Sequence, residues 1–330
     1  MWNTGRRVAE PMPMPGNGGG AGSAVTAVAP GWAIAALVIL GVLTVVAAMF
    51  DGALTARANG GSGGMGRPFG ESARLMRQRR RTTIEADSLL WRIGGAGLLV
   101  TAALMVTVVP LGEWVVFDLD VGVMWFNAMD VMVWALVWLT GWGANSAHSL
   151  VGGYRFLAHG LGYELPLMFA LVAPAIAAQS LNVGVVAAAQ EDLWFVVWMP
   201  VAFLVYLLGA AAFSVWGPFA AAIGADIAGG ARAELSGVDR LVFEAGRYAL
   251  LAAGAAFAVP MFLGGDAGPV LPGWAWVLVK TVAVLGVLVW LRRRLPAFRP
   301  DKFMEVGWML LLPAVLLQDL VVAVIAVRRS

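Results

Sequence analysis

Long apolar runs separated by shorter polar stretches form the main pattern of this chain. Each run is close to the roughly 20 residues that a helix needs to cross a bilayer. The runs are continuous and do not alternate, which favours helices over a transmembrane barrel. The pattern therefore predicts an all-α, polytopic membrane protein with about eight transmembrane helices. We place these spans at about residues 31–50, 90–110, 121–142, 160–180, 194–216, 242–263, 272–291 and 304–327.

The segments outside the spans predict little folded structure beyond one surface helix. Residues 1–30 are rich in Gly, Pro, Ala and Met, as flexible tails are, so we expect a tail followed by one eight-helix membrane domain over 31–330. Within residues 69–94, Leu75 and Met76 interrupt a basic run at helical spacing. This spacing predicts an amphipathic helix on the cytoplasmic surface, either against anionic lipid headgroups or docked onto a soluble partner.

Composition narrows the possible chemistry. The chain is 60% hydrophobic and 13% charged, with a mean hydropathy of +0.81. It contains no cysteine, which excludes disulfides, thiolate zinc sites and ordinary iron–sulfur clusters within this chain. His148 and His159 stand apart from any Cys/His cluster, and we expect them to be polar loop residues with no metal site. No motif for a flavin is present, so any redox centres are expected in other subunits.

The distribution of Lys and Arg predicts the orientation in the membrane. Basic residues lie in the loops after spans one, three, five and seven, whereas the other loops carry acidic residues instead. Cytoplasmic loops hold the excess of Lys and Arg in membrane proteins. We therefore expect the odd-numbered loops to be cytoplasmic and both termini to lie on the opposite side.

Charged residues inside the predicted spans are the strongest functional signal. Each costs about 2.5–3.5 kcal/mol at a helix centre on insertion scales, and such residues mark proton, ion or substrate paths. Glu244 and Arg247 are three residues apart and can pair on one helix face. Glu164 and Lys280 have no such local partner, so we expect them to lie on a functional path. The full set is Asp130, Glu164, Glu244, Arg247, Lys280 and Asp319.

Two ordered segments carry a family resemblance. The first contains, in order, Gly141-Trp142, Asn145-Ser146, Ser149-Leu150, Gly152, Arg155 and Tyr163-Glu164. The second contains Trp290, Arg292, Pro296, Arg299, Asp301, Met304, Gly307-Trp308 and Leu312-Pro313. Both resemble the H subunit of NADH-quinone oxidoreductase, the membrane subunit of respiratory complex I that adjoins the quinone site.

The resemblance implies a role for the whole chain. It would be a subunit without the catalytic redox centres in a proton-translocating NADH:quinone oxidoreductase of the cell membrane. It would wall the quinone tunnel and anchor the peripheral arm, with ubiquinone or menaquinone bound at the interface. Its partners would be the other subunits and membrane lipids, and no nucleic acid is expected.

The resemblance also implies roles for particular residues. The quinone-tunnel or proton-path candidates are Asp51, Glu164, Lys280, Asp226 and Glu234. The candidates in loops that dock partner subunits are Arg155, Arg292, Arg299 and Asp301. No residue is expected to be catalytic or to bind a metal ion.

The chain departs from the family pattern mainly in its acidic residues. The fifth loop keeps Pro218-Phe219, Asp226 and Glu234 but little other acid. The family's Ala-Glu at the end of span five is Ala212-Phe213, and its Ala-Glu-Tyr in span six is Gly246-Arg247-Tyr248. The last change replaces a carboxylate with the opposite charge.

Three other interpretations remain open. Loss of the loop acids fits the anchor subunit of a membrane-bound hydrogenase-type complex, in which quinone need not be the acceptor. A stand-alone transporter would need substrate ligands near the bilayer midplane, and no internal repeat supports it. A purely structural anchor would have lost its roles in both proton translocation and quinone reduction.

Overall fold

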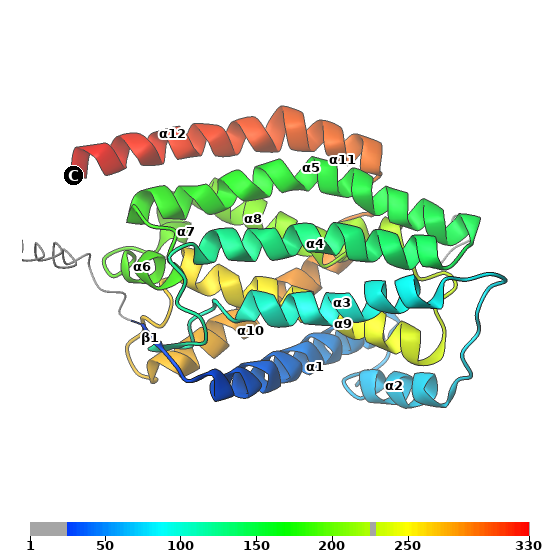
Figure 1. Cartoon of the computed structure of the whole chain (residues 1–330). Coiled ribbons are helices and arrows are strands. Elements are labelled where there is room, and N and C mark those ends of the chain that lie inside the picture. Colours follow the sequence, from blue (N-terminus) through cyan, green and yellow to red (C-terminus); the bar gives the residue numbers. More distant parts are fainter. Residues whose placement is uncertain (1–24, 225–228, 330) are drawn as a thin grey trace, which may run out of the picture.

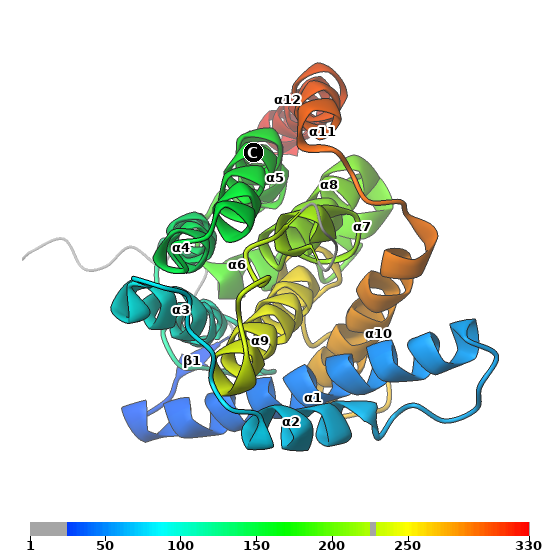
Figure 2. The same ribbon diagram turned by 90° about the vertical axis from the view of Figure 1, so that its right-hand side faces the viewer.

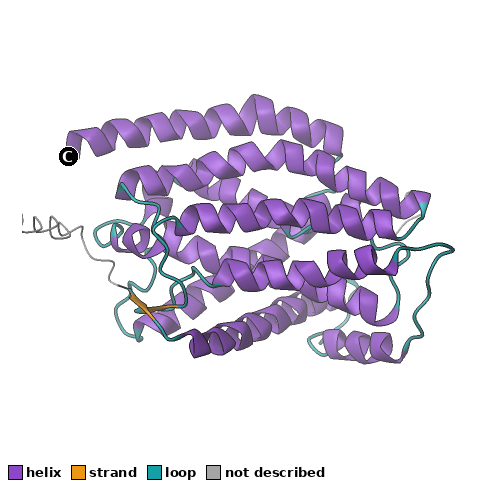
Figure 3. Ribbon diagram, viewed as in Figure 1, coloured by secondary structure: helices purple, strands orange, loops and turns teal. Residues whose placement is uncertain are grey.

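The computed structural model describes residues 25–224 and 229–329, which form a bundle of helices running along one long axis (Figure 1). Two very short strands at one end are the only strands in the described part of the chain (Figure 3). The elements in chain order are β1 (Thr26–Ala27), η1 (Pro30–Trp32), α1 (Ala33–Ala58), α2 (Arg67–Arg77), α3 (Ser88–Val106), β2 (Trp114–Val115), α4 (Gly122–Gly143), α5 (Ala147–Ala178), α6 (Val183–Ala188), α7 (Phe195–Trp198), α8 (Pro200–Phe213), η2 (Gly217–Ile223), α9 (Gly237–Phe262), α10 (Gly273–Arg294), α11 (Pro300–Val306), η3 (Gly307–Leu311) and α12 (Leu312–Arg329).

Eight helical segments of the described chain are long and apolar enough to cross a membrane. This confirms the prediction of an all-α polytopic membrane protein. Each of the eight overlaps one predicted span, and the fourth begins much earlier than expected.

Helix α9 lies in the middle of the bundle, surrounded by α1, α3, α8 and α10 (Figure 2). It is the most enclosed of the spans, and much of its length is alanine. Small side chains allow helix backbones to approach closely, which is how membrane helices pack without a hydrophobic driving force between them. In contrast, α1 and α12 lie at the edge of the bundle and expose many Leu and Val side chains.

The two ends of the bundle differ in charge. One end carries α2, the last turn of α1, the last turn of α10 and the start of α11 (Figure 1, right). We call it the basic end, because it holds Arg57, Arg67, Arg74, Arg77, Arg292, Arg293 and Arg294. The opposite end carries β1, β2 and α6.

Polar side chains supply hydrogen bonds where the helices begin or break. The chain breaks between α7 and α8 at Pro200, which has no backbone N–H to continue a helix. Gln318 on α12 spans this break, since its Oε1 accepts from Ala202 N at 2.9 Å and its Nε2 donates to Trp198 O at 3.1 Å. At the start of α3, Asp87 accepts from Leu89 N and Leu90 N. Side-chain acceptors of this kind satisfy the free amides of a first helical turn.

The fourth span differs most from its prediction. Helix α5 begins at Ala147, and so His148, Arg155 and His159 are helical residues. The expectation that His148 and His159 lie in loops is therefore wrong. The residues before 160 include Ser, His and Gly, which lower the local hydropathy, but Ser149 and His159 are fully buried by neighbouring elements. Burial against other segments is invisible in a hydropathy pattern.

Two other segments differ from the predictions. Residues 1–24 lie outside the described residues, but Thr26–Ala27 of the expected tail form β1, which pairs in parallel with β2. Within residues 69–94, helix is confined to α2 and to the start of α3, with an irregular stretch from 78 to 87 between them. On α2, Leu75 is buried against the bundle, whereas Phe69 and Met76 are exposed.

The last span contains one turn of π-helix, η3, where it crosses α5. At the crossing, a Cβ on Gly307 would collide with the carbonyl oxygen of Gly162. Pro166 has no N–H to donate to the Gly162 carbonyl four residues earlier in α5. No helical hydrogen bond therefore occupies that carbonyl oxygen where η3 approaches it. Trp308 Nε1 donates to Leu161 O at 2.9 Å and fixes the same contact. The π-turn therefore holds the last span against the turn of α5 that precedes Tyr163 and Glu164.

This close contact makes a prediction about stability. Gly307→Ala is expected to separate α5 from η3 and to lower the free energy of unfolding by about 1–3 kcal/mol, as overpacking of a core does. Thermal unfolding of the purified protein in one detergent measures the change. Gly286→Ala in α10 is the matched control, because the nearest atom to its added Cβ would be Phe50 at 3.9 Å. Equal midpoints for the two variants would contradict the proposed contact.

Candidate functional site

A pair of carboxyl groups lies in the interior between α4 and α5. Asp130 on α4 is fully buried and lies near Tyr163 and Glu164 of α5. Asn127 Nδ2 donates to Glu164 Oε1 at 3.2 Å, and Trp134 Nε1 donates to the Tyr163 hydroxyl at 2.9 Å. Adjacent turns of two helices thus bring together groups that lie 29 to 37 residues apart in the sequence.

No cation neutralises this pair within the described chain. Among the described residues, no N–H group donates a hydrogen bond to either oxygen of Asp130 or to Oε2 of Glu164. Neither residue forms an ion pair in this part of the chain. Two neighbouring carboxylates in an apolar interior cannot both be ionised at low cost. The pair is therefore suited to hold a proton and to exchange it.

Glu164 lies near the middle of its helix and not at the mouth of a span. Helix α5 has 32 residues, of which 17 precede Glu164 and 14 follow it. The position is therefore midway along α5, where the side chain of Glu164 is half-buried.

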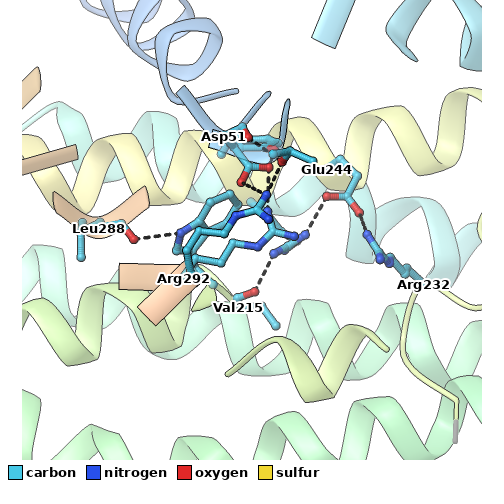
Figure 4. A network of polar contacts seen from close by, with 11 residues as sticks. Asp51, Val215, Arg232, Glu244, Leu288 and Arg292 are labelled. Carbon is cyan, nitrogen blue, oxygen red and sulfur yellow. Dashed lines mark hydrogen bonds and ion pairs between the residues drawn. The ribbon is translucent and has the colours of Figure 1, made fainter. Parts of the chain in front are cut away.

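A second group of charges lies at the basic end, between α1, α9 and α10 (Figure 4). Asp51 on α1 pairs with Arg292 at 2.7 Å and with Arg293 at 3.6 Å, and the Tyr248 hydroxyl donates to it at 3.1 Å. Arg293 also contacts the hydroxyl of Thr55. Asp51 is thus neutralised by two arginines, one of which is a residue expected to dock partner subunits.

Glu244 on α9 continues this network. Its two oxygens pair with Arg232 and with Arg247, each at 2.6 Å. Arg247 is 3% exposed and also donates to Val215 O at 2.6 Å (Figure 4). The intramembrane pair of Glu244 and Arg247 expected from the sequence thus has a third member, Arg232.

Trp216 lies between the two parts of the network. The guanidinium of Arg292 lies 4.8 Å from the centre of its ring and that of Arg247 lies 5.6 Å away. The indole N–H donates to Leu288 O at 3.2 Å and so fixes the ring. Stacking of this kind stabilises arginines away from water.

The backbone next to Trp216 is strained. Val215 has φ of +52°, in the left-handed region that β-branched residues rarely adopt. Such a conformation costs on the order of 1–3 kcal/mol and persists only where its surroundings enforce it. The hydrogen bonds of Val215, from its own N–H to Ala212 O and from Arg247 to its carbonyl, hold it there.

Lys280 lies at the opposite end of the bundle and makes no ion pair with the buried carboxyls. Its ammonium donates to the carbonyls of Leu263, Gly265 and Ala267 at 2.8, 3.0 and 2.8 Å. It also lies 4.2 Å from the centre of the Trp194 ring. With three carbonyls it uses all of its donors, so it holds the chain after α9 in place.

The other predicted site residues are spread over the basic end. Arg155 donates to Gly229 O at 3.1 Å, and Glu234 accepts from the Ser146 hydroxyl at 2.8 Å. Arg299 and Asp301 pair with each other at 3.0 Å and are largely exposed. Asp226 lies outside the described residues.

Two members of the buried groups had been given no role from the sequence. Asp130 was recognised only as a charge inside a span, because its partner is on another helix. His159 was assigned to a loop, but its ring is fully buried, and neither ring nitrogen has a hydrogen-bond partner. In the described residues no cluster of three potential His, Asp or Glu ligands exists that could hold a metal ion.

The network at the basic end makes a prediction about stability. Glu244→Gln leaves Arg232 and Arg247 without an anion, and removing one partner of a buried ion pair costs about 3–5 kcal/mol. We expect a clear fall in the thermal midpoint of the purified protein. Glu71→Gln, which breaks the largely exposed pair with Arg74 on α2, is the matched control and should leave the midpoint unchanged. A Glu244→Gln protein as stable as the native one would contradict a stabilising role for the network.

Comparisons with known proteins identify the family of this chain. The model of the NADH dehydrogenase family matches residues 27–323. An H subunit of NADH-quinone oxidoreductase from Geobacter sulfurreducens, numbered 2 in that organism, is 34% identical over 269 residues, which is 78% of this chain and 82% of the relative. The H subunit numbered 2 of Cereibacter sphaeroides is 38% identical over 219 residues, which is 66% of this chain and 69% of the relative. The H subunit of Geobacillus kaustophilus is 31% identical over 273 residues, which is 81% of this chain and 82% of the relative. The chain therefore belongs to the NADH dehydrogenase family, among proteins named as the H subunit of NADH-quinone oxidoreductase.

Proposed function

We propose that this chain is the membrane subunit of a complex I-like NADH-quinone oxidoreductase. In this role it walls the quinone site, anchors the peripheral arm and links quinone reduction to proton translocation. The observation that carries the proposal is the pair formed by the fully buried Asp130 and the half-buried Glu164, which has no cation beside it in the described part of a chain of this family. A purely structural anchor has no use for such a pair, since buried unpaired carboxyls destabilise a membrane domain.

The proposed proton work is assigned to α4 and α5. A proton held between two carboxyls can move when the electrostatic field around them changes, because each carboxyl competes for it. Quinone reduction takes up protons and electrons at the boundary with partner subunits and so changes that field. The hydrogen bond from Asn127 orients the Glu164 carboxyl beside Asp130 while the proton moves.

The proposed quinone and partner contacts lie at the basic end. The protein lies in the plasma membrane in this proposal. The basic end faces the cytoplasm, because cytoplasmic loops hold the excess of Lys and Arg. Phe69 and Met76 on α2 are exposed beside a helix surface rich in arginine, which suits both an isoprenoid tail and lipid. Arg299 and Asp301 stand out from the start of α11 and form part of the surface for the peripheral arm. Quinone is the substrate of the assembly, and its electrons come from redox centres in partner subunits.

The assembly is tested by purifying the chain from its native membranes in a gentle detergent and identifying what comes with it. We expect iron–sulfur subunits and the partner subunits of a quinone site. A nickel-binding partner with intact cysteine ligands would move the assignment to a hydrogenase-type complex. Recovery of an active chain alone, under conditions that keep such complexes together, would favour a transporter instead.

The proton link is tested by Glu164→Gln in the assembled complex. The substitution removes one of the two acidic groups that share a proton. We expect proton translocation per quinone reduced to fall on the order of tenfold or more, in the range of a lost acid–base group. The measurement is the pH change in sealed vesicles, and quinone reduction with an added proton ionophore shows that the complex is intact.

Glu113→Gln provides the matched control for this substitution. Glu113 is exposed at the opposite end of the bundle, in the loop before β2, so its loss should leave translocation unchanged. If Glu164→Gln and Glu113→Gln both translocate protons at the native ratio, Glu164 has no part in the proton path.

A further inference from the structure

The ionisable side chains of the interior fall into two kinds. Asp51, Glu244 and Arg247 are in ion pairs, and Lys280 is bound by carbonyls. The remaining acids and one histidine form no ion pair in the described chain, and each has at least one buried polar atom without a hydrogen-bond partner there. They are Asp130, His159, Glu164 and Asp319. Three of these four lie on neighbouring turns of α4 and α5.

The paired carboxylates near the basic end are poor carriers of protons. An arginine keeps its charge at any physiological pH. A carboxylate that faces one or two arginines at 2.6–2.7 Å therefore stays ionised and has no reason to accept a proton. A proton path from the basic end to Asp130 and Glu164 thus has to avoid Asp51 and Glu244.

His159 lies on such a path. It is one helical turn before Tyr163 on α5, so both side chains are on the same face of the helix. The ring of Phe219 contacts both residues, at 5.3 Å from the His159 ring centre and 6.5 Å from that of Tyr163. Phe303 covers the histidine from α11 at 5.9 Å. The imidazole is thus enclosed by aromatic rings on the basic-end side of the carboxyl pair.

The polar chemistry of His159 is not explained by packing. A buried histidine in a core normally has a partner for at least one nitrogen, because an unpaired buried polar group costs about 1–3 kcal/mol. Here neither nitrogen has one among the described residues, and the ring is 0% exposed. Leucine would fill this place at lower cost, so packing alone does not account for the imidazole.

Tyr163 can pass a proton between the histidine and the carboxyls. Its oxygen already accepts a hydrogen bond from Trp134, which leaves its own O–H to donate. The groups it faces are the carboxyls of Asp130 and Glu164. Four residues separate His159 from Tyr163, a rise of about 6 Å along the axis of α5, and the line requires one hydrogen-bonded water between their side chains.

We propose that His159 is the first proton acceptor on the basic-end side of a transfer line that runs through Tyr163 to the Asp130–Glu164 pair. A proton binds one imidazole nitrogen as the other nitrogen releases its own toward Tyr163. The tyrosine oxygen takes up that proton while its original O–H proton passes to a carboxyl, so His159 and Tyr163 both return to their starting charge. The inference rests on the proposed proton translocation and names the side chain through which the protons arrive.

His159→Leu tests the line in the intact complex, in sealed vesicles. We expect proton translocation per quinone reduced to fall on the order of tenfold or more, while quinone reduction with an added ionophore stays within about twofold of native. Because leucine removes an unpaired buried polar group, the variant is expected to fold and to unfold at a temperature no lower than that of the native protein.

Phe156→Leu is the matched control, since Phe156 is fully buried on the same helix one turn before His159. Native translocation in Phe156→Leu with loss in His159→Leu supports the line. Native translocation in His159→Leu, or an equal loss in both variants, overturns it. Glu164→Gln separates this result from the proposed function: if Glu164→Gln loses translocation and His159→Leu does not, only the role of His159 fails, and if neither loses it, the proposed proton work fails as well.

Discussion

The pairing of Glu244 with Arg247 is the interaction on which much of this structure depends. In the interior of a membrane protein a charge has to be paired, or the group has to be neutral, because no water is available to solvate it. Arg247 meets this condition with Glu244 on its own helix and with the Val215 carbonyl on the segment that follows α8. The arginine therefore joins the central helix α9 to the chain that closes the bundle at the basic end.

The same condition divides the interior into two regions with different electrostatic behaviour. Around α1, α9 and α10, each carboxylate has at least one arginine within 3 Å, and the charges are fixed. Between α4 and α5, Asp130 and Glu164 have only each other, an amide and a phenol. A fixed network resists reorganisation, whereas a pair that shares a proton responds to a small change in field.

The sequence predicted the fold well and the site only in part, for a physical reason. Span number and helical class follow from hydropathy, which is a property of consecutive residues, and the spacing of Glu244 and Arg247 predicts a pair on one helix. The partner of Asp130 lies on another helix, and the two arginines that bind Asp51 come from α10, more than 200 residues away. The start of α5 was misplaced because burial of Ser149 and His159 comes from tertiary contacts. The hydropathy pattern along the chain does not show which distant residues come into contact.

The departures from the family pattern also gain a physical account. With a carboxylate at position 247, two acids three residues apart would lie on one face of α9, and like charges at that spacing repel. Arginine at this position instead forms the pair with Glu244 and the bond to Val215. The segment from Val215 to Phe219 then connects both regions, since its first carbonyl binds Arg247 and the ring of Phe219 contacts His159 and Tyr163. The left-handed Val215, which accepts that bond, lies four residues before Phe219. The charge at position 247, where the family has an acid, is thus linked through this short segment to α5, the helix that carries the unpaired Glu164.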